Sequence, residues 1–140
     1  IFEKSFSEIT TFLNDSITED LFKRLNINPN KLGLYRDLKK GAKNIVITLG
    51  KSGVFYTDGK EKLMIPSIKV NAVDTTGAGD AFNGGFATAI ASGADMKTAL
   101  RFANCVGALS VTKPGTSPAM PYKDEIYALY EKEYGEKISF

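Results

Sequence analysis

The feature that most constrains this chain is a run of small residues leading directly into a helical pattern. The run reads Asp74-Thr75-Thr76-Gly77-Ala78-Gly79-Asp80 and continues as Ala81-Phe82-Asn83-Gly84-Gly85-Phe86-Ala87. We predict a helix over residues 80–91, ended by Ser92-Gly93. A loop of this kind leaves the backbone N–H groups of Gly77, Ala78 and Gly79 unpaired at the positive end of the helix dipole. Such groups form a pocket for a phosphate or a developing oxyanion.

The same run ends in a carboxylate, Asp80, which a bound anion would repel. An acid beside an anion pocket is useful if it accepts the proton of a hydroxyl that attacks phosphorus. This interpretation makes Asp80 a general base in phosphoryl transfer to an alcohol. The alternative is that Asp80 is a helix N-cap and that the glycines serve a tight turn.

Composition limits the classes of partner. A chain of 140 residues with 43% hydrophobic and 24% charged residues is typical of one globular domain. The net charge of +2 is too small to indicate a nucleic acid or a membrane surface as partner. No apolar run is long enough to cross a bilayer. We therefore expect neither nucleic acid nor membrane binding.

The rare residue types limit the chemistry. The chain has one cysteine, Cys105, and no histidine. A single cysteine excludes an internal disulfide and fits the reducing cytoplasm, where we expect this protein to be. Cys105 lies in an apolar stretch, which favours a small buried side chain over a nucleophile. The absence of histidine excludes Ser-His-Asp and Cys-His hydrolases and histidine-ligated zinc.

The order of the predicted elements indicates an α/β fold. Residues 44–49 are a β-branched run typical of a strand buried on both faces, and residues 53–57 and 62–65 flank a hairpin turn at Asp58-Gly59. Helical patterns that alternate with such strands predict a doubly wound, mostly parallel sheet flanked by helices. The other expected elements are helices over 7–13, 19–25 and 31–40, a strand over 68–73, a helix from the cap Asp95 to 111, an irregular loop over 113–118, and a helix over 123–134 that covers the sheet edge.

Residues 74–87 resemble the C-terminal signature of the ribokinase-like (PfkB) carbohydrate kinases. The hydroxyl-flanked Asp, the two small residues, the Gly-Asp pair and the small-residue helix all match. The resemblance covers essentially the whole chain, but only the C-terminal half of the family's usual length. It implies a ribokinase-like fold in which residues 1–140 carry the nucleotide site and the base. The N-terminal half and the β-sheet lid would be missing, so we expect a fragment that is inactive alone.

The resemblance also implies an ATP site. Thr48-Leu49-Gly50-Lys51-Ser52-Gly53 lies where a strand ends, the edge at which open α/β sheets bind ligands. Thr48, Gly50, Ser52 and Gly53 would contact the phosphates and ribose of ATP, although a strand–turn–strand corner explains the segment as well. Asn104 would lie near the adenine, or else on a solvated helix face.

Two metal sites follow from the resemblance. Glu8, in Ser5-Phe6-Ser7-Glu8, fits the carboxylate of a motif that orders magnesium through water, but Ser5 stands where the family has Asn. Glu8 is also explained as a first-turn helix residue that favours the dipole. The second site would bind a monovalent cation, potassium. Its implied ligands are the carboxylate of Asp74, the backbone oxygens of Thr76, Ser110, Lys113 and Gly115, and Ala119 where some members have a serine.

The implied activity is ATP-dependent phosphorylation of a sugar hydroxyl, as in ribokinase, fructokinase or 2-keto-3-deoxygluconate kinase. The cofactors would be ATP and Mg²⁺, with K⁺ as activator, and the partner a small-molecule sugar. A homodimer is one arrangement open to the intact enzyme. Two alternatives stay open: a nucleoside or vitamin-precursor kinase of the same fold, and a nucleotide-binding domain without catalysis.

Overall fold

The computed structural model describes residues 43–58 and 60–140. These divide into two compact units, each described by itself here. The first comprises residues 43–47, 55–58 and 60–64, and the second comprises residues 48–54 and 65–140. The helices predicted over 7–13, 19–25 and 31–40, and with them Glu8, lie outside the described residues.

The described strands form one small sheet. Strands β1 (Ile45–Thr48), β2 (Val54–Thr57) and β3 (Lys62–Ile65) are paired in the order β1-β2-β3. Neighbouring strands are antiparallel, because their short connections cannot make a parallel crossover, which takes a dozen residues or more. The predicted hairpin is confirmed. Asp58 Oδ1 accepts hydrogen bonds from the N–H groups of Lys60 and Glu61 at 2.8 and 2.6 Å.

The predicted doubly wound parallel sheet is not confirmed, because the sheet of the described residues is antiparallel. Two other expectations about the strands are wrong. β1 is half-buried with Thr48 exposed, rather than buried on both faces. Residues 68–73 form no strand. The N–H groups of Val73 and Asp74 donate instead to the carbonyl of Val111, at 2.7 and 3.2 Å. Because the residue at the end of a helix accepts these hydrogen bonds, the segment does not pair with a strand despite its β-branched residues.

Gly53 closes the tight turn between β1 and β2. Residues Gly50–Ser52 form one 3₁₀ turn, and the N–H of Leu49 donates to the carbonyl of Gly53 at 2.8 Å. The φ angle of Gly53 is +101°, and a Cβ atom there would lie 2.0 Å from the carbonyl oxygen of Ile65. Only glycine is suited to this position, because it adopts a positive φ without strain and leaves room for the backbone of Ile65.

Three helices make up about half of the second unit: α4 (Ala78–Ala91), α5 (Met96–Ser110) and α6 (Lys123–Tyr134). Helix α5 begins at the predicted cap, Asp95, whose carboxylate accepts from the N–H and hydroxyl of Thr98 at 3.0 and 2.7 Å. The bounds of α6 are those predicted, whereas α4 begins two residues before its predicted start. The loop after α5, expected to be irregular throughout, contains a short 3₁₀ turn at Ser117–Ala119.

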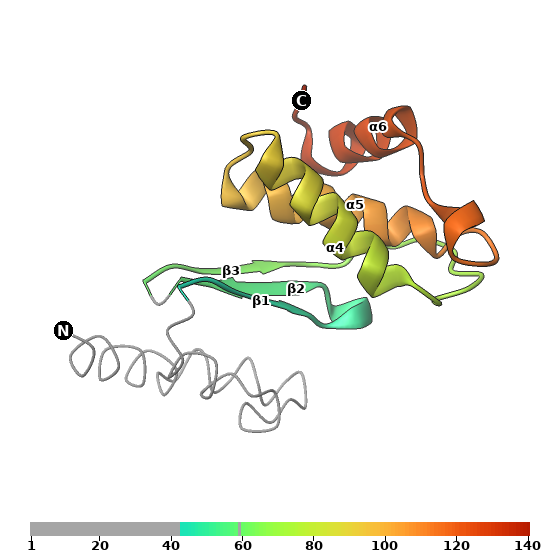
Figure 1. Cartoon of the computed structure of the whole chain (residues 1–140), viewed down its shortest axis with the longest axis horizontal. Helices are drawn as coiled ribbons and strands as arrows, with labels where there is room; N and C mark the ends of the chain where they lie inside the picture. The colour runs from blue at the N-terminus through green and yellow to red at the C-terminus, as the bar shows by residue number, and fades with distance from the viewer. Residues whose placement is uncertain (1–42, 59) are drawn as a thin grey trace. The chain divides into compact units, whose positions relative to one another are not determined.

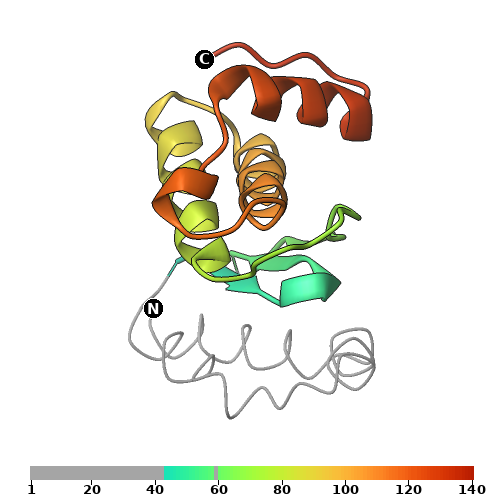
Figure 2. The same ribbon diagram turned by 90° about the vertical axis from the view of Figure 1, so that its right-hand side faces the viewer.

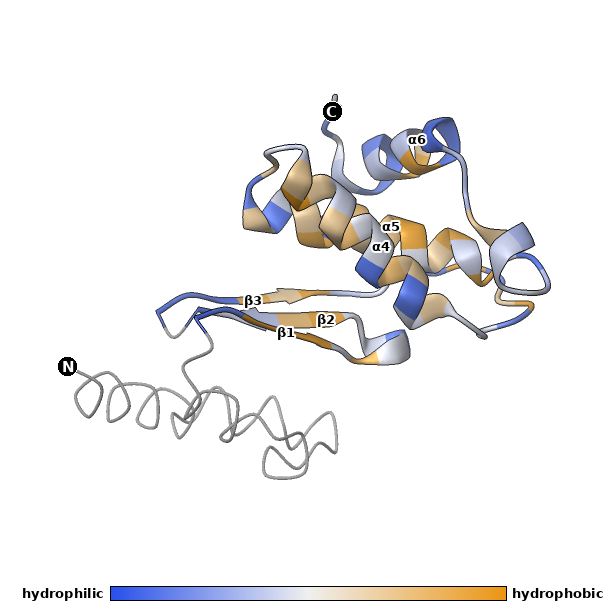
Figure 3. Cartoon of the chain, in the orientation of Figure 1, coloured by the Kyte–Doolittle hydropathy of each residue, from blue (hydrophilic) through white to orange (hydrophobic). Residues whose placement is uncertain are grey.

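The core of this unit lies between the helices. Helix α4 runs beside α5, and α6 packs against α5, not against a sheet edge as expected (Figures 1 and 2). In Figure 3, α4 and α5 are largely apolar, whereas α6 is hydrophilic over most of its surface. Only a few side chains of α6, including Ile126 and Tyr130, therefore enter the core. The buried cluster comprises Ile68, Ala81, Ala89, Ala99, Phe102, Cys105, Val106, Ile126 and Tyr130.

Cys105 is one of the fully buried residues of this core, as expected. Burial raises the pKa of its thiol to about 12, so the reactive thiolate is not populated near neutral pH. No helix of the described residues combines the length and the apolar character that crossing a membrane requires.

Gly85 sets the separation of α4 and α5. A Cβ atom on Gly85 would lie 2.7 Å from Val106 Cγ2 and 3.0 Å from Val106 Cβ, on the facing helix. Valine is stiff at χ1 and cannot turn away easily. The preceding residue, Gly84, is exposed, and a Cβ atom there would meet nothing within 4 Å.

The two glycines predict opposite effects of the same substitution. Gly85→Ala is expected to lower the free energy of unfolding by about 1–3 kcal/mol, because it overpacks the helix interface. Gly84→Ala is expected to raise it by about 0.5–1 kcal/mol, through better helix propensity alone. Urea unfolding of both variants, followed by circular dichroism, measures the two values. Stabilisation by Gly85→Ala would contradict the close contact.

Candidate functional site

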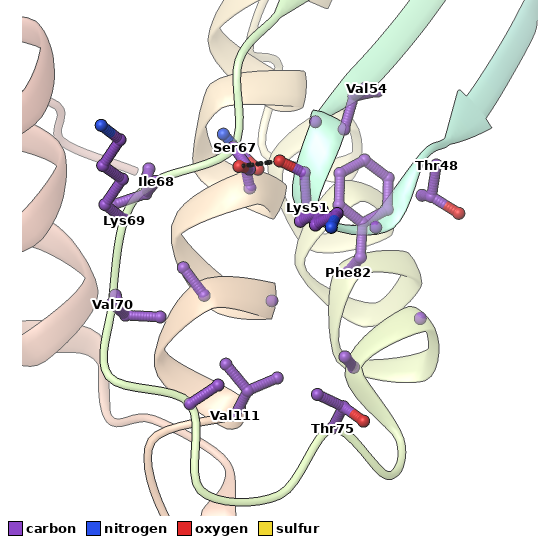
Figure 4. A pocket seen from close by; sticks show the side chains of 18 residues that line it. Thr48, Lys51, Val54, Ser67, Ile68, Lys69, Val70, Thr75, Phe82 and Val111 are labelled. Carbon is purple, nitrogen blue, oxygen red and sulfur yellow. Dashed lines mark hydrogen bonds between the residues drawn. The ribbon is translucent and has the colours of Figure 1, made fainter. Parts of the chain in front are cut away.

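One pocket of about 600 Å³ opens in the second unit. Its walls come from three parts of the chain: the turn after β1, the segment from Ser67 to the start of α4, and the middle of α5 (Figure 4). Most of the lining is apolar, including Phe82, Val70 and Val111. A largely apolar pocket with a few polar groups is the usual form of a small-molecule site.

The turn after β1 contributes most of the residues expected there. Thr48, Gly50 and Gly53 line the pocket, whereas Ser52 does not. Lys51, between them in sequence, does line it and brings a positive charge. The carbonyl of Lys51 accepts a hydrogen bond from the hydroxyl of Ser67 at 2.5 Å, which ties the turn to the segment along the other wall (Figure 4).

Asn104 reaches the pocket from α5. It is buried, with 8% of its surface exposed, so the alternative of a solvated helix face is wrong. Its Nδ2 donates to the carbonyl of Pro66 at 2.8 Å and to the hydroxyl of Tyr134 at 3.3 Å. Both amide hydrogens are therefore used within the protein.

The signature loop turns into α4 at Gly77. This residue is the N-cap, with φ +77°, and α4 begins at Ala78. Asp80 is thus the third residue of the helix, and the alternative in which Asp80 is the N-cap is wrong. A Cβ atom on Gly77 would lie 3.1 Å from Thr116 Cγ2, so the left-handed turn also brings the loop close to residue 116.

The unpaired backbone N–H groups at the start of α4 differ from the predicted set in one residue, because Asp80 takes the place of Ala78. The N–H of Ala78 donates to the carbonyl of Thr75 at 3.3 Å. The N–H groups of Gly77, Gly79 and Asp80 make no hydrogen bond to the part of the chain that the structure describes. Gly79 lines the pocket, whereas Gly77 and the exposed Asp80, its close neighbours in the sequence, do not. The helix start therefore presents one unpaired donor at the pocket, with two more and a carboxylate on residues close to it in the sequence.

Asp74 ties the signature loop to the loop after α5. Its Oδ1 accepts the N–H of Thr76 at 2.9 Å, and its Oδ2 accepts the N–H of Gly115 at 3.0 Å. Hydrogen bonds from the side chain and backbone of Thr76 and from the Gly115 backbone lower the pKa of Asp74 to about 2. The structure thus brings together Asp74, Thr76 and Gly115 of the expected cation site.

For the other residues expected at the cation site, the structure gives contacts of atoms other than the expected backbone oxygens. The hydroxyl of the buried Ser110 donates to the carbonyl of Gly107 at 2.8 Å. Lys113 forms an ion pair with Glu125 at 3.0 Å, and the N–H of the buried Ala119 donates to Thr116. The described residues contain no cluster of three or more Asp, Glu, Cys or His side chains that could hold a metal ion.

Sequence reasoning missed much of the pocket wall. Ser67, Ile68, Lys69 and Val70 line it, and so does Phe82 of α4. The alternation in residues 68–73 was interpreted as a strand, although in the structure the segment serves as a wall. Phe82 is an aromatic residue among small ones, and this contrast is the signal in the sequence that could have identified it.

Comparison with known proteins gives a consistent result. Residues 10–123 match the model of the pfkB family carbohydrate kinase. The chain is 49% identical over 85 residues, or 61% of its length, to a ribokinase of Bacillus subtilis. It superposes on the structure of Arabidopsis thaliana ribokinase complexed with ribose and ATP with a TM-score of 0.67, at 31% identity over 72% of the chain. The Burkholderia thailandensis nucleoside kinase in complex with inosine gives a TM-score of 0.68, at 29% identity over 78%.

The chain spans only part of each of these proteins. It covers 29% of the length of the B. subtilis ribokinase, 33% of the A. thaliana chain and 40% of the B. thailandensis chain.

The contacts of Asp74 predict a pH dependence. Its folded pKa of about 2 lies below the value of 3.8 for a free carboxyl, so the ionised form stabilises the fold above about pH 4. That contribution is lost as the pH falls through about 2. Asp74→Asn is therefore expected to lower the melting temperature near neutral pH, with a difference from wild type that shrinks between about pH 4 and pH 2. A difference independent of pH would contradict the assignment.

Proposed function

We propose that this chain, which belongs to the pfkB family of carbohydrate kinases, is the ATP-binding and catalytic-base part of an enzyme that phosphorylates a sugar hydroxyl. The observation that carries the proposal is that one pocket joins the turn after β1, Asn104 and the start of α4. Three segments expected to bind one nucleotide are far apart in sequence and meet at one place.

The pocket suits ATP in one orientation. Its apolar part next to Asn104 accepts a base, while the unpaired N–H groups of Gly79 and the neighbouring Gly77 and the charge of Lys51 suit phosphates. Thr48, Gly50 and Gly53 then lie along the ribose and phosphates, and Ser52 acts by closing the turn through its N–H, which donates to Leu49 at 3.0 Å. The structure of the related A. thaliana ribokinase is that of a complex with ribose and ATP, which supports this choice of ligand.

The chemistry that follows is an in-line transfer. Asp80 accepts the proton of the sugar hydroxyl as the hydroxyl oxygen forms a bond to the γ-phosphorus. The bond from phosphorus to the β–γ bridging oxygen breaks, and ADP leaves with that electron pair. The N–H groups of Gly77, Gly79 and Asp80 donate to the phosphoryl oxygens as charge gathers there. The position of Asp80, exposed beside the pocket, suits a base that faces a second substrate.

Metal ions complete the proposed site. Mg²⁺ would supply positive charge for the phosphates of bound ATP, and Glu8 is proposed to orient its water shell. K⁺ is proposed to bind where Asp74 holds the loop of Gly115, with Thr76 nearby. Backbone carbonyls of Ser110, Lys113, Gly115 and Ala119 are its further proposed ligands.

The substrate is proposed to be a sugar, because the B. subtilis relative, at 49% identity, is a ribokinase. The structural similarity to a nucleoside kinase in complex with inosine favours a nucleoside as the second candidate. A non-catalytic nucleotide-binding domain is less well supported, because Gly77-Ala78-Gly79-Asp80 is intact. We further propose that the enzyme is cytoplasmic and that its remaining part supplies the parallel sheet, the lid and the sugar contacts. This chain alone would then be inactive. A homodimer is one assembly open to the intact enzyme.

Removing the base tests the mechanism in the full-length enzyme. Asp80→Asn is expected to reduce turnover at least about a hundredfold and to leave ATP affinity nearly unchanged, because the side chain lies outside the pocket lining. ADP release with a panel of sugars and nucleosides measures turnover, and calorimetry measures ATP binding. Asp95→Asn is the matched control: it makes the same change at the start of α5, where asparagine caps a helix equally well. Equal turnover of the two variants would refute the assigned base.

Potassium dependence is a separate prediction. Replacing K⁺ by a large inert cation such as tetramethylammonium is expected to lower the rate. K⁺ is proposed to bind where Asp74 joins the Gly115 loop to the loop of Gly77 and Gly79, and so to order the second loop. Asp74→Asn should reduce the response to K⁺ as well as the rate. Steady-state rates at constant ionic strength measure both effects, and a rate indifferent to the cation would exclude this site.

A further inference from the structure

We propose that Tyr134 of α6 is a positioning residue for the nucleotide pocket. Together with the carbonyl of Pro66, its hydroxyl holds the amide of Asn104 so that only an acceptor oxygen faces the ligand. The pocket would then select a base that donates a hydrogen bond from its 6-position, as the 6-amino group of adenine does. This inference rests on the proposed function, because it assumes that the pocket binds a nucleotide.

The orientation of the Asn104 amide is fixed by chemistry. The carbonyl of Pro66 can only accept a hydrogen bond, so the atom 2.8 Å from it must be Nδ2 and not Oδ1. The second hydrogen of Nδ2 is directed to the hydroxyl oxygen of Tyr134 at 3.3 Å. An amide nitrogen has two hydrogens, and both are used.

The remaining atom of the amide, Oδ1, stays available. It accepts no hydrogen bond from the described residues, and among them the hydroxyl of Tyr130 is the only buried side-chain polar atom without a partner. Oδ1 of Asn104 is therefore not fully enclosed. Because Asn104 lines the pocket, we infer that the accessible side of its amide is the pocket side.

Tyr134 is itself held in place by its neighbours. Its ring packs against that of Tyr130 at 4.9 Å between centroids, and the guanidinium of Arg101 lies 4.6 Å from the centre of the Tyr134 ring. Arg101 also forms an ion pair with Glu136 at 3.3 Å. Helix α6 and the residues after it thus fix the position of a hydroxyl that reaches the pocket wall.

Selection follows from what an acceptor can bind. The 6-amino group of adenine can donate to Oδ1, whereas the 6-oxo group of guanine or hypoxanthine would face it acceptor to acceptor. Purine riboside triphosphate, which is ATP without the 6-amino group, removes the donor and adds no acceptor at that position. A neutral hydrogen bond changes affinity by about twofold to tenfold.

The test compares these two nucleotides in the full-length enzyme. Wild type is expected to bind ATP about twofold to tenfold more tightly than purine riboside triphosphate, measured by calorimetry and as the ratio of KM values. In Tyr134→Phe the KM for ATP should rise without a comparable rise for purine riboside triphosphate, so that the ratio falls towards one. Asn104→Ala should abolish the preference.

Tyr130→Phe is the matched control. It removes the same hydroxyl from the residue one turn earlier on α6, where that hydroxyl lies beside the guanidinium of Arg101 and is not a hydrogen-bond partner of Asn104. Its nucleotide ratio should equal that of wild type. A role of Tyr134 in stability alone would weaken both nucleotides equally and leave the ratio unchanged.

Other outcomes would overturn the inference. Equal binding of both nucleotides by wild type, or an unchanged ratio in Tyr134→Phe, would show that the Asn104 oxygen does not select the base. If ATP binds with the expected preference but is never used to phosphorylate a sugar or nucleoside, the proposed function fails and the positioning role stands. If neither nucleotide binds, both proposals fail.

Discussion

The close contact between α4 and α5 is the constraint on which the site depends. Gly85 leaves no room for a side chain against Val106, and the two helices can approach only because that side chain is absent. This approach brings the start of α4, with its unpaired donors, to the same pocket as Asn104 of α5. A larger separation would move these two parts of the pocket wall apart.

A second constraint is the pair of hydrogen bonds that Asp74 accepts. Asp74 accepts backbone hydrogen bonds from its own loop and from Gly115, 41 residues later in the sequence. The signature loop is therefore held from both sides, by α4 after it and by the Gly115 loop across from it. The carboxylate of Asp74 therefore fixes the shape of the loop through backbone hydrogen bonds.

The sequence predicted those parts of the fold that depend on local interactions. The cap Asp95, the hairpin at Asp58 and the bounds of α6 all follow from side chains within a few residues of each element. Residues 68–73 show where this fails. Their alternation favours a strand, but the partner for their backbone donors is the carbonyl of Val111, about 40 residues away. A pattern of period two does not specify which acceptor the chain will meet.

The site was predictable to a similar extent. The motif at 74–80 predicts an anion-binding segment. Which of its N–H groups stay unpaired depends on where α4 begins, and the left-handed turn at Gly77 decides that start. Likewise, Asn104 could be identified as a candidate, whereas its fixed orientation depends on Pro66 and Tyr134. No short motif connects those three residues, because they belong to different elements.

The burial of Cys105 has a consequence for how motion in this unit can be followed. The thiol lies in the core shared by α5 and α6, and its raised pKa keeps it unreactive while the two helices are packed. An alkylating reagent can therefore modify it only in molecules in which that interface has opened. The same opening would separate Tyr134 from Asn104. The rate of labelling of Cys105 would therefore report how often this part of the pocket wall opens.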